Sequence, residues 1–460
     1  GFAKGAMAGE GTGDNPFTGL PQDFTLFAPR GHYTLNEDFK AYFRTTYLLG
    51  TPFPLDNEGG AAVTLLLCHI LSVPQVQEKW RALYDPIRYL VGSSNVNTWD
   101  ELAEVLKPFK LGDLGDAGRV KELLEVLDRT GKASAIQKLP GKKFAVLPRR
   151  ITFDAMIFDT LTHPRTSTNE DKRALPDPLD VMAVLGSPQA LDEVKPYEKF
   201  KNYGDNLKVL EERWPEYRSS ADGANAYTAW LSALRSYNVS EGSQQFFART
   251  AAWGYKKLTT AEASMAELKH DTILYAEQSG AEMGDGGGEW VAGPFSQPFA
   301  RGYVEPEPEL WSRLYRLAES SGEGLSALSL LSEEDRKNLE LLKGLIGQLR
   351  DISVKELKNQ ALSEEDYKLI RGYGGNIEHF WQEVNRGAAG GESLLAREFP
   401  AAVIADIASS PDGSCLEAGT GRCAEIYVLV PLDGKLRITR GSVYSYYEFP
   451  SEERLTDNRW

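Results

Sequence analysis

The chain has 460 residues, of which 42% are hydrophobic and 25% are charged, as in ordinary globular proteins. Its formal net charge is −15 and it contains no run of lysines and arginines, which argues against binding to nucleic acids or to anionic membrane surfaces. No apolar run approaches the ~20 residues that a membrane-spanning helix needs. The longest, 61–71, is too short and contains His69.

Helical patterns follow one another from about residue 36 to residue 385. Asn36 is expected to cap the first helix and Gly50 to end it, because these residue types suit helix N- and C-termini respectively. Pro74 is expected to break or kink a second stretch, 61–83. Later helical stretches are predicted over 100–109, 117–131, 153–163, 177–187, 224–237, 244–278, 306–320, 332–360 and 363–384.

The stretch 244–278 is predicted to be a helical pair or one helix broken at Gly254. Thr259 or Thr260 can cap its second part, because a hydroxyl accepts a hydrogen bond from a free first-turn amide. Apolar side chains then recur every three or four residues and predict one buried face. The two Ser-Glu-Glu-Asp sequences at 332 and 363 are typical of helix starts, and we interpret them as capping chemistry.

The pattern changes to β-strand near the C-terminus, where short β-branched and aromatic runs cover 401–410, 425–432, 435–442 and 443–449. The turn at 432–435 contains Asp-Gly and suits a tight hairpin. We therefore predict a mainly α protein of the α+β class, in which a large multi-helix body carries a small C-terminal antiparallel sheet.

We divide the chain into four parts on these patterns. Residues 1–20 are glycine-rich, lack a hydrophobic signal-peptide core and form a flexible N-terminal segment that begins at a processed or trimmed end. Residues 21–400 form the helical body, with a sub-boundary in the Pro- and Asp-rich loop 164–178. Residues 401–450 form the β region packed on that body, and 451–460 form a C-terminal tail.

Glu267, His270 and Asp271 form the main cluster of ionisable groups on a predicted helix. Two carboxylates one turn apart repel each other unless a cation or a proton lies between them. The cluster is therefore either a catalytic site with His270 as general acid or base, or a buried polar group that stabilises the helix packing. Glu267-x-x-His270 matches half of a di-metal carboxylate motif, but a second copy is absent, so we predict no metal site.

A second polar cluster, Arg30, His32 and Tyr33, directly precedes the first long helix. These side chains either bind a carboxylate ligand or pin the entering chain to the core. His379 is a further candidate for ligand binding. No nucleophile elbow, phosphate-binding loop or dinucleotide-binding fingerprint is present in the sequence.

Cys415 and Cys423 are separated by seven residues that include two glycines, which would let the chain fold back. We predict a disulfide between them, with two free thiols as the alternative, and disfavour a two-cysteine metal site because no histidine lies within ligand spacing. We expect no cofactor. Asp285 and Glu289, in the glycine-rich loop 284–299, are candidate Ca²⁺ ligands, although two carboxylates do not complete such a site.

Several blocks of the sequence, taken together and in this order, resemble the prokaryotic domain of unknown function 3160 family. The blocks are 29–44, 144–162, 179–187, 264–279, 302–314, 370–379 and 416–449, so the resemblance covers nearly the whole chain. It implies an exported or lipid-anchored envelope protein with a longer N-terminal portion, and it implies no established activity. Cys415 and Cys423 do not look like features of the family.

These observations predict a secreted or cell-surface protein with a structural or protein-interaction role, whose partners are other proteins or copies of itself in a larger assembly. The alternative is an envelope hydrolase or small-ligand-binding protein with a central pocket around His270 and Asp271. The missing catalytic motifs favour the first hypothesis. A deep, solvent-reached pocket beside these residues would favour the second.

Overall fold

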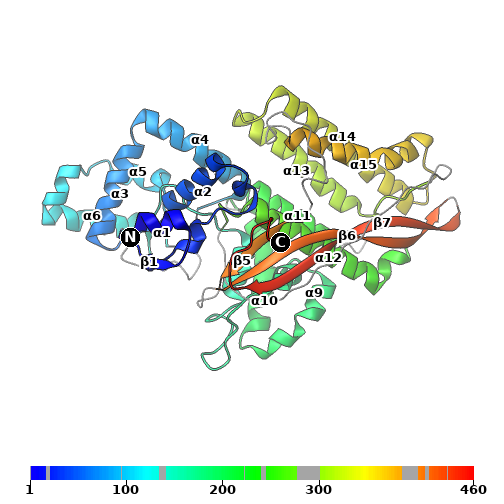
Figure 1. The fold of residues 1–460 in the computed structure, drawn as a ribbon, viewed down its shortest axis with the longest axis horizontal. Helices are drawn as coiled ribbons and strands as arrows, with labels where there is room; N and C mark the ends of the chain where they lie inside the picture. Colours follow the sequence, from blue (N-terminus) through cyan, green and yellow to red (C-terminus); the bar gives the residue numbers. More distant parts are fainter. Residues whose placement is uncertain are drawn as a thin grey trace.

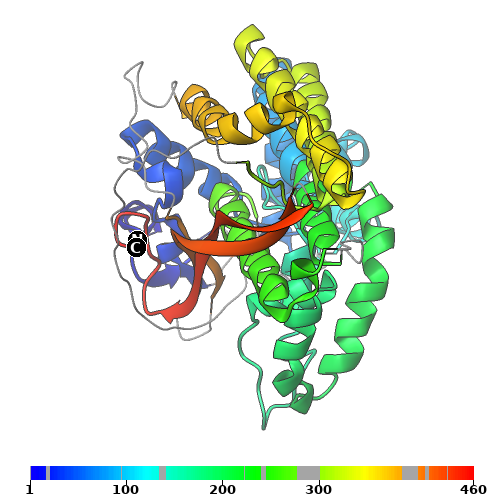
Figure 2. The same ribbon diagram turned by 90° about the vertical axis from the view of Figure 1, so that its right-hand side faces the viewer.

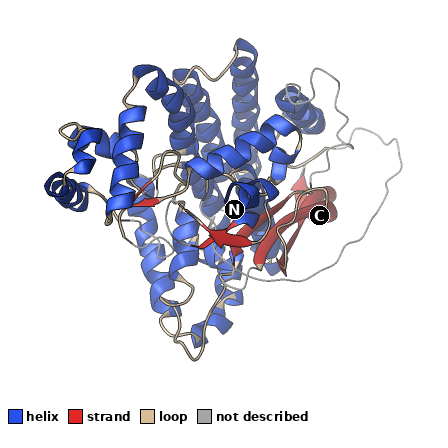
Figure 3. Ribbon diagram, turned by 60° about the vertical axis from the view of Figure 1, so that its left-hand side comes forward, coloured by secondary structure: helices blue, strands red, loops and turns tan. Residues whose placement is uncertain are grey.

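The computed structural model describes residues 2–16, 21–94, 96–133, 141–221, 223–239, 245–276, 301–385, 402–409, 414–432 and 434–460. Helices dominate this part of the chain (Figures 1 and 3). In chain order the α-helices are α1 Phe2–Ala8, α2 Glu37–Leu49, α3 Glu58–Leu71, α4 Pro74–Val91, α5 Trp99–Leu106, α6 Ala117–Thr130, α7 Phe153–Thr160, α8 Pro178–Val184, α9 Pro188–Glu193, α10 Tyr203–Ser219, α11 Ala226–Asn238, α12 Ala251–Asp271, α13 Pro308–Ala327, α14 Glu333–Leu357 and α15 Glu364–Asn385.

Strands form three antiparallel sheets in the described residues, two of them small. The main sheet has the order β5-β6-β7, with β5 Ile404–Ser409, β6 Cys415–Leu432 and β7 Lys435–Ser451. The others pair β1 Thr12–Asp14 with β2 Pro21–Asp23, and β3 Phe53–Pro54 with β4 Lys143–Phe144. Short 3₁₀ helices are η1 Phe24–Phe27, η2 Gly31–Thr34, η3 Leu111–Gly115, η4 Lys195–Lys199 and η5 Phe247–Arg249. The predicted mainly helical body with a C-terminal antiparallel sheet is thus confirmed.

Three groups of buried apolar side chains hold the helices together. The largest lies between α7, α8, α10, α11, α12 and the inner face of β5 and β6. A second lies among α3, α4, α5 and α6, and a smaller third packs α14 against the segment around Val304. Figure 1 shows the corresponding arrangement: α3 to α6 at the left, α13 to α15 at the upper right, and the sheet across the centre.

Local capping chemistry sets several helix ends where the sequence predicted them. The Asn36 side chain accepts a hydrogen bond from the Phe39 amide, and Gly50 follows the last turn of α2. Pro74 is the first residue of α4, which is bent by 99° relative to α3. Ser332 forms the predicted capping box with Asp335. Each of these ends depends on residues within one turn of each other, which is why sequence patterns find them.

The prediction for α12 was wrong at its start. Thr250, and neither Thr259 nor Thr260, caps the helix, and Gly254 lies inside the first turn without a break. The Gly254 amide donates a hydrogen bond to the Thr250 carbonyl at 3.1 Å, so the helical hydrogen-bond pattern is intact at the glycine. A single helix from 251 to 271 replaces the predicted pair.

The main sheet is longer than its sequence pattern suggested. The runs predicted at 435–442 and 443–449 are one continuous strand, and β6 extends back to Cys415. The β6–β7 register runs from Cys415 opposite Ser451 to Leu432 opposite Lys435, with an irregularity between Thr420 and Cys423. The sheet curves as it crosses α12 (Figure 2).

A buried carboxylate joins the two ends of the chain to the sheet. Asp406 on β5 accepts a hydrogen bond from Arg30 Nε at 2.5 Å and from Arg30 Nη2 at 3.2 Å. Arg454, just beyond β7, also pairs with Asp406. Burial alone would raise the pKa of Asp406, but the two guanidinium groups outweigh it and hold the pKa below the ordinary value.

Glu356 near the end of α14 is a buried carboxyl group in the third core. Burial, supported by the nearby charge of Asp366, raises its pKa to about 8, even though Glu356 accepts a hydrogen bond from the Val304 amide at 3.0 Å. The group therefore binds a proton in the folded protein at neutral pH.

Within the described ranges, none of the helices alone combines the length and the apolar composition that crossing a membrane requires. Only α3 and α4 taken together have sufficient length and apolarity, and they form the bent pair described above.

Replacing Asp406 by Asn should destabilise the fold by roughly 3–5 kcal/mol, because it leaves two buried guanidinium groups without their carboxylate. Urea unfolding at pH 7 measures this. Asp192→Asn, in the exposed pair with Lys195, is the control and should have little effect. In the wild type, Asp406 stabilises the fold at pH 7, and this contribution to the free energy of unfolding is lost only as the pH falls below the ordinary aspartate pKa of about 3.9. Equal stability of the two variants at pH 7 would contradict this account.

The raised pKa of Glu356 predicts that this residue lowers the stability of the folded protein more as the pH rises. A carboxyl group with a raised folded-state pKa lowers stability as the pH rises from its unfolded pKa of about 4.3 toward its folded one. Glu356→Gln should therefore gain stability relative to the wild type between pH 5 and pH 9, by a few kcal/mol at about 1.4 kcal/mol per pKa unit. Denaturant unfolding at both pH values measures the gain. Glu340→Gln, at an exposed position on the same helix, should show no such gain. If the stability difference between Glu356→Gln and the wild type did not change with pH, the raised pKa of Glu356 would be contradicted.

Candidate functional site

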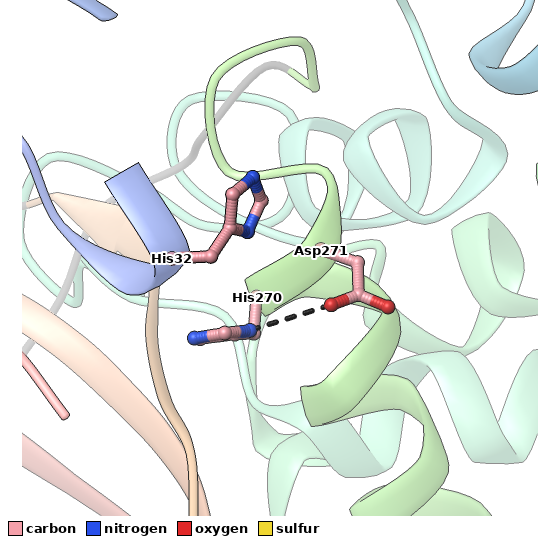
Figure 4. Close-up of side chains that lie close together, drawn as sticks. All are labelled: His32, His270 and Asp271. Carbon is pink, nitrogen blue, oxygen red and sulfur yellow. Dashed lines mark hydrogen bonds and ion pairs between the residues drawn. The ribbon is translucent and has the colours of Figure 1, made fainter. Parts of the chain in front are cut away.

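The C-terminal end of α12 meets the short helix η2, and this junction brings His32, His270 and Asp271 together (Figure 4). One ligand atom from each of these residues lies within 4.8 Å of the others. Gly31 allows η2 to approach His270 closely. Its φ of +56° is one that glycine adopts without strain, and a Cβ at this position would lie only 3.1 Å from His270 Nε2. His32, from the predicted cluster before α2, therefore joins His270 and Asp271 of the predicted cluster on α12.

His270 is held from both sides of its imidazole ring. Its Nε2 lies 2.9 Å from Asp457 Oδ2, and its Nδ1 lies 3.4 Å from Asp271 Oδ1. Burial alone would lower the pKa of His270, but the hydrogen bonds to Asp271 and Asp457 outweigh it and raise the pKa to about 9. The ring therefore carries a positive charge at neutral pH when only these protein groups surround it.

The other members of the cluster differ in exposure. The His270 side chain is 9% exposed, whereas that of Asp271 is 75% exposed, so the cluster opens to solvent on the Asp271 side. The pKa of His32 is lowered by burial and then by the nearby His270. Glu267, one turn before Asp271, has its pKa raised to about 7 by burial and by the charge of Asp271. Carboxylates thus outnumber imidazoles around this junction.

Arg30 and Tyr33, predicted as ligand-binding candidates or as pinning residues, make structural contacts. Arg30 is buried, pairs with Asp406 and donates to the Ala28 carbonyl at 3.0 Å. Tyr33 packs on Phe43 in the core, and burial raises its pKa to about 12. Both side chains fix the segment that carries His32.

His379 does not join the cluster. It lies on the exposed part of α15, where its ring is 5.7 Å from that of Phe380. The candidate Ca²⁺ ligands Asp285 and Glu289 lie outside the described residues.

The predicted disulfide between Cys415 and Cys423 is wrong. Both are free thiols on the same strand, β6, with eight residue steps and roughly 25 Å of extended chain between them at ~3.3 Å per residue. A disulfide needs Cα atoms within ~7 Å. The two intervening glycines do not fold the chain back, because residues 415–419 pair with both β5 and β7, and Thr420 and Cys423 also pair with β7.

A cavity of about 590 Å³ lies away from the histidine cluster, between α10, α11 and α13. Its walls include Trp214, Arg218, Arg235, Glu307 and Arg313, and none of the predicted site residues. This cavity is therefore not the central pocket around His270 and Asp271 that the alternative hypothesis requires.

The far half of the β6–β7 hairpin is a second candidate site. We call residues 421–432 and 435–444 the distal ribbon, because beyond Gly419 β6 pairs with β7 and no longer with β5. One face bears exposed apolar side chains: Tyr427 is 67% exposed, Leu429 39%, Leu436 61% and Ile438 73%. Leu429 lies opposite Ile438 and Pro431 opposite Leu436, so these side chains share one face.

The opposite face of the distal ribbon carries the buried Val430 and Leu432, and α12 and η5 contact β6. A sheet face that looks away from the core usually carries polar residues, so an apolar outer face in addition to a buried inner face is unusual. The run of β-branched and aromatic residues at 425–432 predicted a strand. It did not reveal that both faces would be apolar.

Sequence reasoning missed Asp457, which contacts His270 across 187 residues. Asp457 Oδ1 also accepts a hydrogen bond from the Ile404 amide at 3.2 Å, which ties the tail to β5. No local pattern marks this residue, because its role depends on the tail folding back over the sheet.

The family model described as "Protein of unknown function (DUF3160)" matches residues 3–460, almost the whole chain. No curated protein and no solved structure gives a significant match to the chain. The extent of the family match agrees with the resemblance carried by the separate sequence blocks. The chain therefore belongs to this family of proteins of unknown function.

Proposed function

We propose that this protein is an exported or surface-exposed assembly subunit, and that it binds a second copy of itself through the outer face of the distal ribbon. The extracellular location comes from the family resemblance. The interaction role is supported by the exposed apolar face of Tyr427, Leu429, Leu436 and Ile438, which is the observation that carries the proposal. Contiguous apolar surface of this kind marks interaction sites in soluble proteins.

Charge argues for a second copy as the partner. The sequence 421–444 contains four basic residues and two acidic ones, whereas the whole chain carries −15. Arg440 lies opposite Tyr427 on the outer face and pairs with Glu425. Lys435 and Arg437 lie on the other face of the ribbon, where both are exposed. A basic apolar ribbon therefore complements the acidic surface that the rest of the same chain presents.

The same charges favour a head-to-tail contact. A symmetric contact of ribbon against ribbon would bring the basic residues of two copies together, which is unfavourable. A contact between the ribbon of one copy and a different, acidic surface of the next is heterologous. Such contacts close into rings or extend into filaments, depending on the rotation between copies.

The alternative of a hydrolase or ligand-binding protein with a pocket around His270 receives less support. His270 is packed and hydrogen-bonded on both ring nitrogens, and the cavity between α10, α11 and α13 lies elsewhere.

The proposal predicts self-association that depends on concentration and salt. In analytical ultracentrifugation at ~0.05 M NaCl the chain should form oligomers, and ~0.5 M NaCl should weaken them because salt screens the attraction between copies. Ile438→Ser should weaken association by roughly 10- to 100-fold, since burying such a side chain contributes about 1.5–3 kcal/mol.

Val209→Ser is the matched control, because Val209 on α10 is 58% exposed and lies outside the ribbon. It should associate like the wild type. A wild type that stays monomeric at high concentration in low salt, or a Val209→Ser variant as impaired as Ile438→Ser, would rule the proposal out.

A further inference from the structure

We propose that His32, His270 and Asp271 form a binding site for a divalent transition-metal ion of the Zn²⁺ class. The observation is the juxtaposition itself: two imidazoles and one carboxylate, from two elements far apart in the sequence, offer donor atoms within 4.8 Å of one another. Imidazole nitrogen with a carboxylate oxygen is a donor set that suits Zn²⁺ and Fe²⁺, and that Mg²⁺ and Ca²⁺ do not prefer.

The donor spacing fits a shared ion. Ligand atoms at ~2.0–2.2 Å from a tetrahedral metal lie about 3.3–3.5 Å apart. His270 Nδ1 and Asp271 Oδ1 are 3.4 Å apart, which already matches this spacing. His32, which is half-buried on η2, completes the set, and Figure 4 shows its ring placed over the His270–Asp271 pair.

Asp457 supplies the outer contact that metal-binding histidines commonly have. Its carboxylate lies 2.9 Å from His270 Nε2 and holds the proton on that nitrogen. The metal ion would replace the proton on Nδ1, which faces Asp271 at 3.4 Å, so binding releases one proton from His270. Asp457 is itself fixed by the Ile404 amide. It is a positioning residue, since it acts on the ion through His270.

The charges around the junction favour a divalent ion in place of the proton that His270 carries in the metal-free protein. Asp271, Asp457 and Glu267 surround two imidazoles, and Glu267 and Asp271 lie one helical turn apart, where like charges repel. A divalent ion between His32, His270 and Asp271 would relieve that repulsion. Asp271 is exposed, so an ion held by these three ligands would keep a coordination position open to water or to an oxygen atom of a ligand.

Cobalt(II) binding to the full, tag-free chain tests the site, because Co²⁺ reports its ligands through visible absorption. The wild type should bind one Co²⁺, displaced by one Zn²⁺ and unaffected by excess Mg²⁺. His32→Ala and Asp271→Asn should each weaken binding at least 10-fold. Asp271 is exposed, so its variant tests the site even if a change at the buried His270 impairs folding. His379→Ala, at an exposed histidine outside the cluster, should bind like the wild type.

Asp457→Asn separates a positioning role from a ligand role. It should weaken Co²⁺ binding by roughly 10- to 100-fold while the absorption bands keep their positions, since the three ligands remain. Absence of stoichiometric binding by the wild type, or His32→Ala binding as tightly as the wild type, would overturn the proposal. These outcomes are independent of self-association through the ribbon.

Discussion

The structure depends on one buried carboxylate, Asp406, which lies between two arginines from opposite ends of the chain. Arg30 precedes the first long helix and Arg454 follows the last strand. A charge at this depth is retained because the guanidinium groups pair with it, and each arginine in turn is placed by the carboxylate. The pairing fixes three segments at once: the entry to α2, strand β5 and the start of the C-terminal tail.

Both candidate sites follow from this anchor. With Arg454 bound to Asp406, and the Leu455 amide donating to Glu417 at 3.0 Å, the tail is directed so that Asp457 reaches His270. With Arg30 bound to the same carboxylate, η2 lies against the end of α12 and His32 approaches the same histidine. The root of β6 and β7 is held between these contacts, so the distal ribbon extends from a fixed base across α12.

Interactions between residues close in the sequence could be predicted from the sequence, whereas contacts between distant segments could not. Asn36, Pro74 and Ser332 mark helix ends because their effects reach only a few residues. Glu267, His270 and Asp271 could be found as a cluster because they lie within one turn. Their union with His32 and Asp457 could not be found, since it depends on how η2 and the tail fold onto α12. The disulfide prediction failed for the same reason: spacing alone suggested a turn at Gly419 and Gly421, whereas pairing with β5 and β7 keeps that segment extended.

Hydrogen–deuterium exchange over a range of protein concentrations in low salt tests the central claim, that a rigidly anchored sheet presents an interaction ribbon. Amides of β5 and of the base of β6 and β7 should exchange slowly at every concentration, because the ion pairs at Asp406 hold them in the most stable part of the fold. Amides of 424–440 should become protected as the concentration rises. Rapid exchange at the base of the sheet, or exchange in the ribbon that does not change with concentration, would contradict the account.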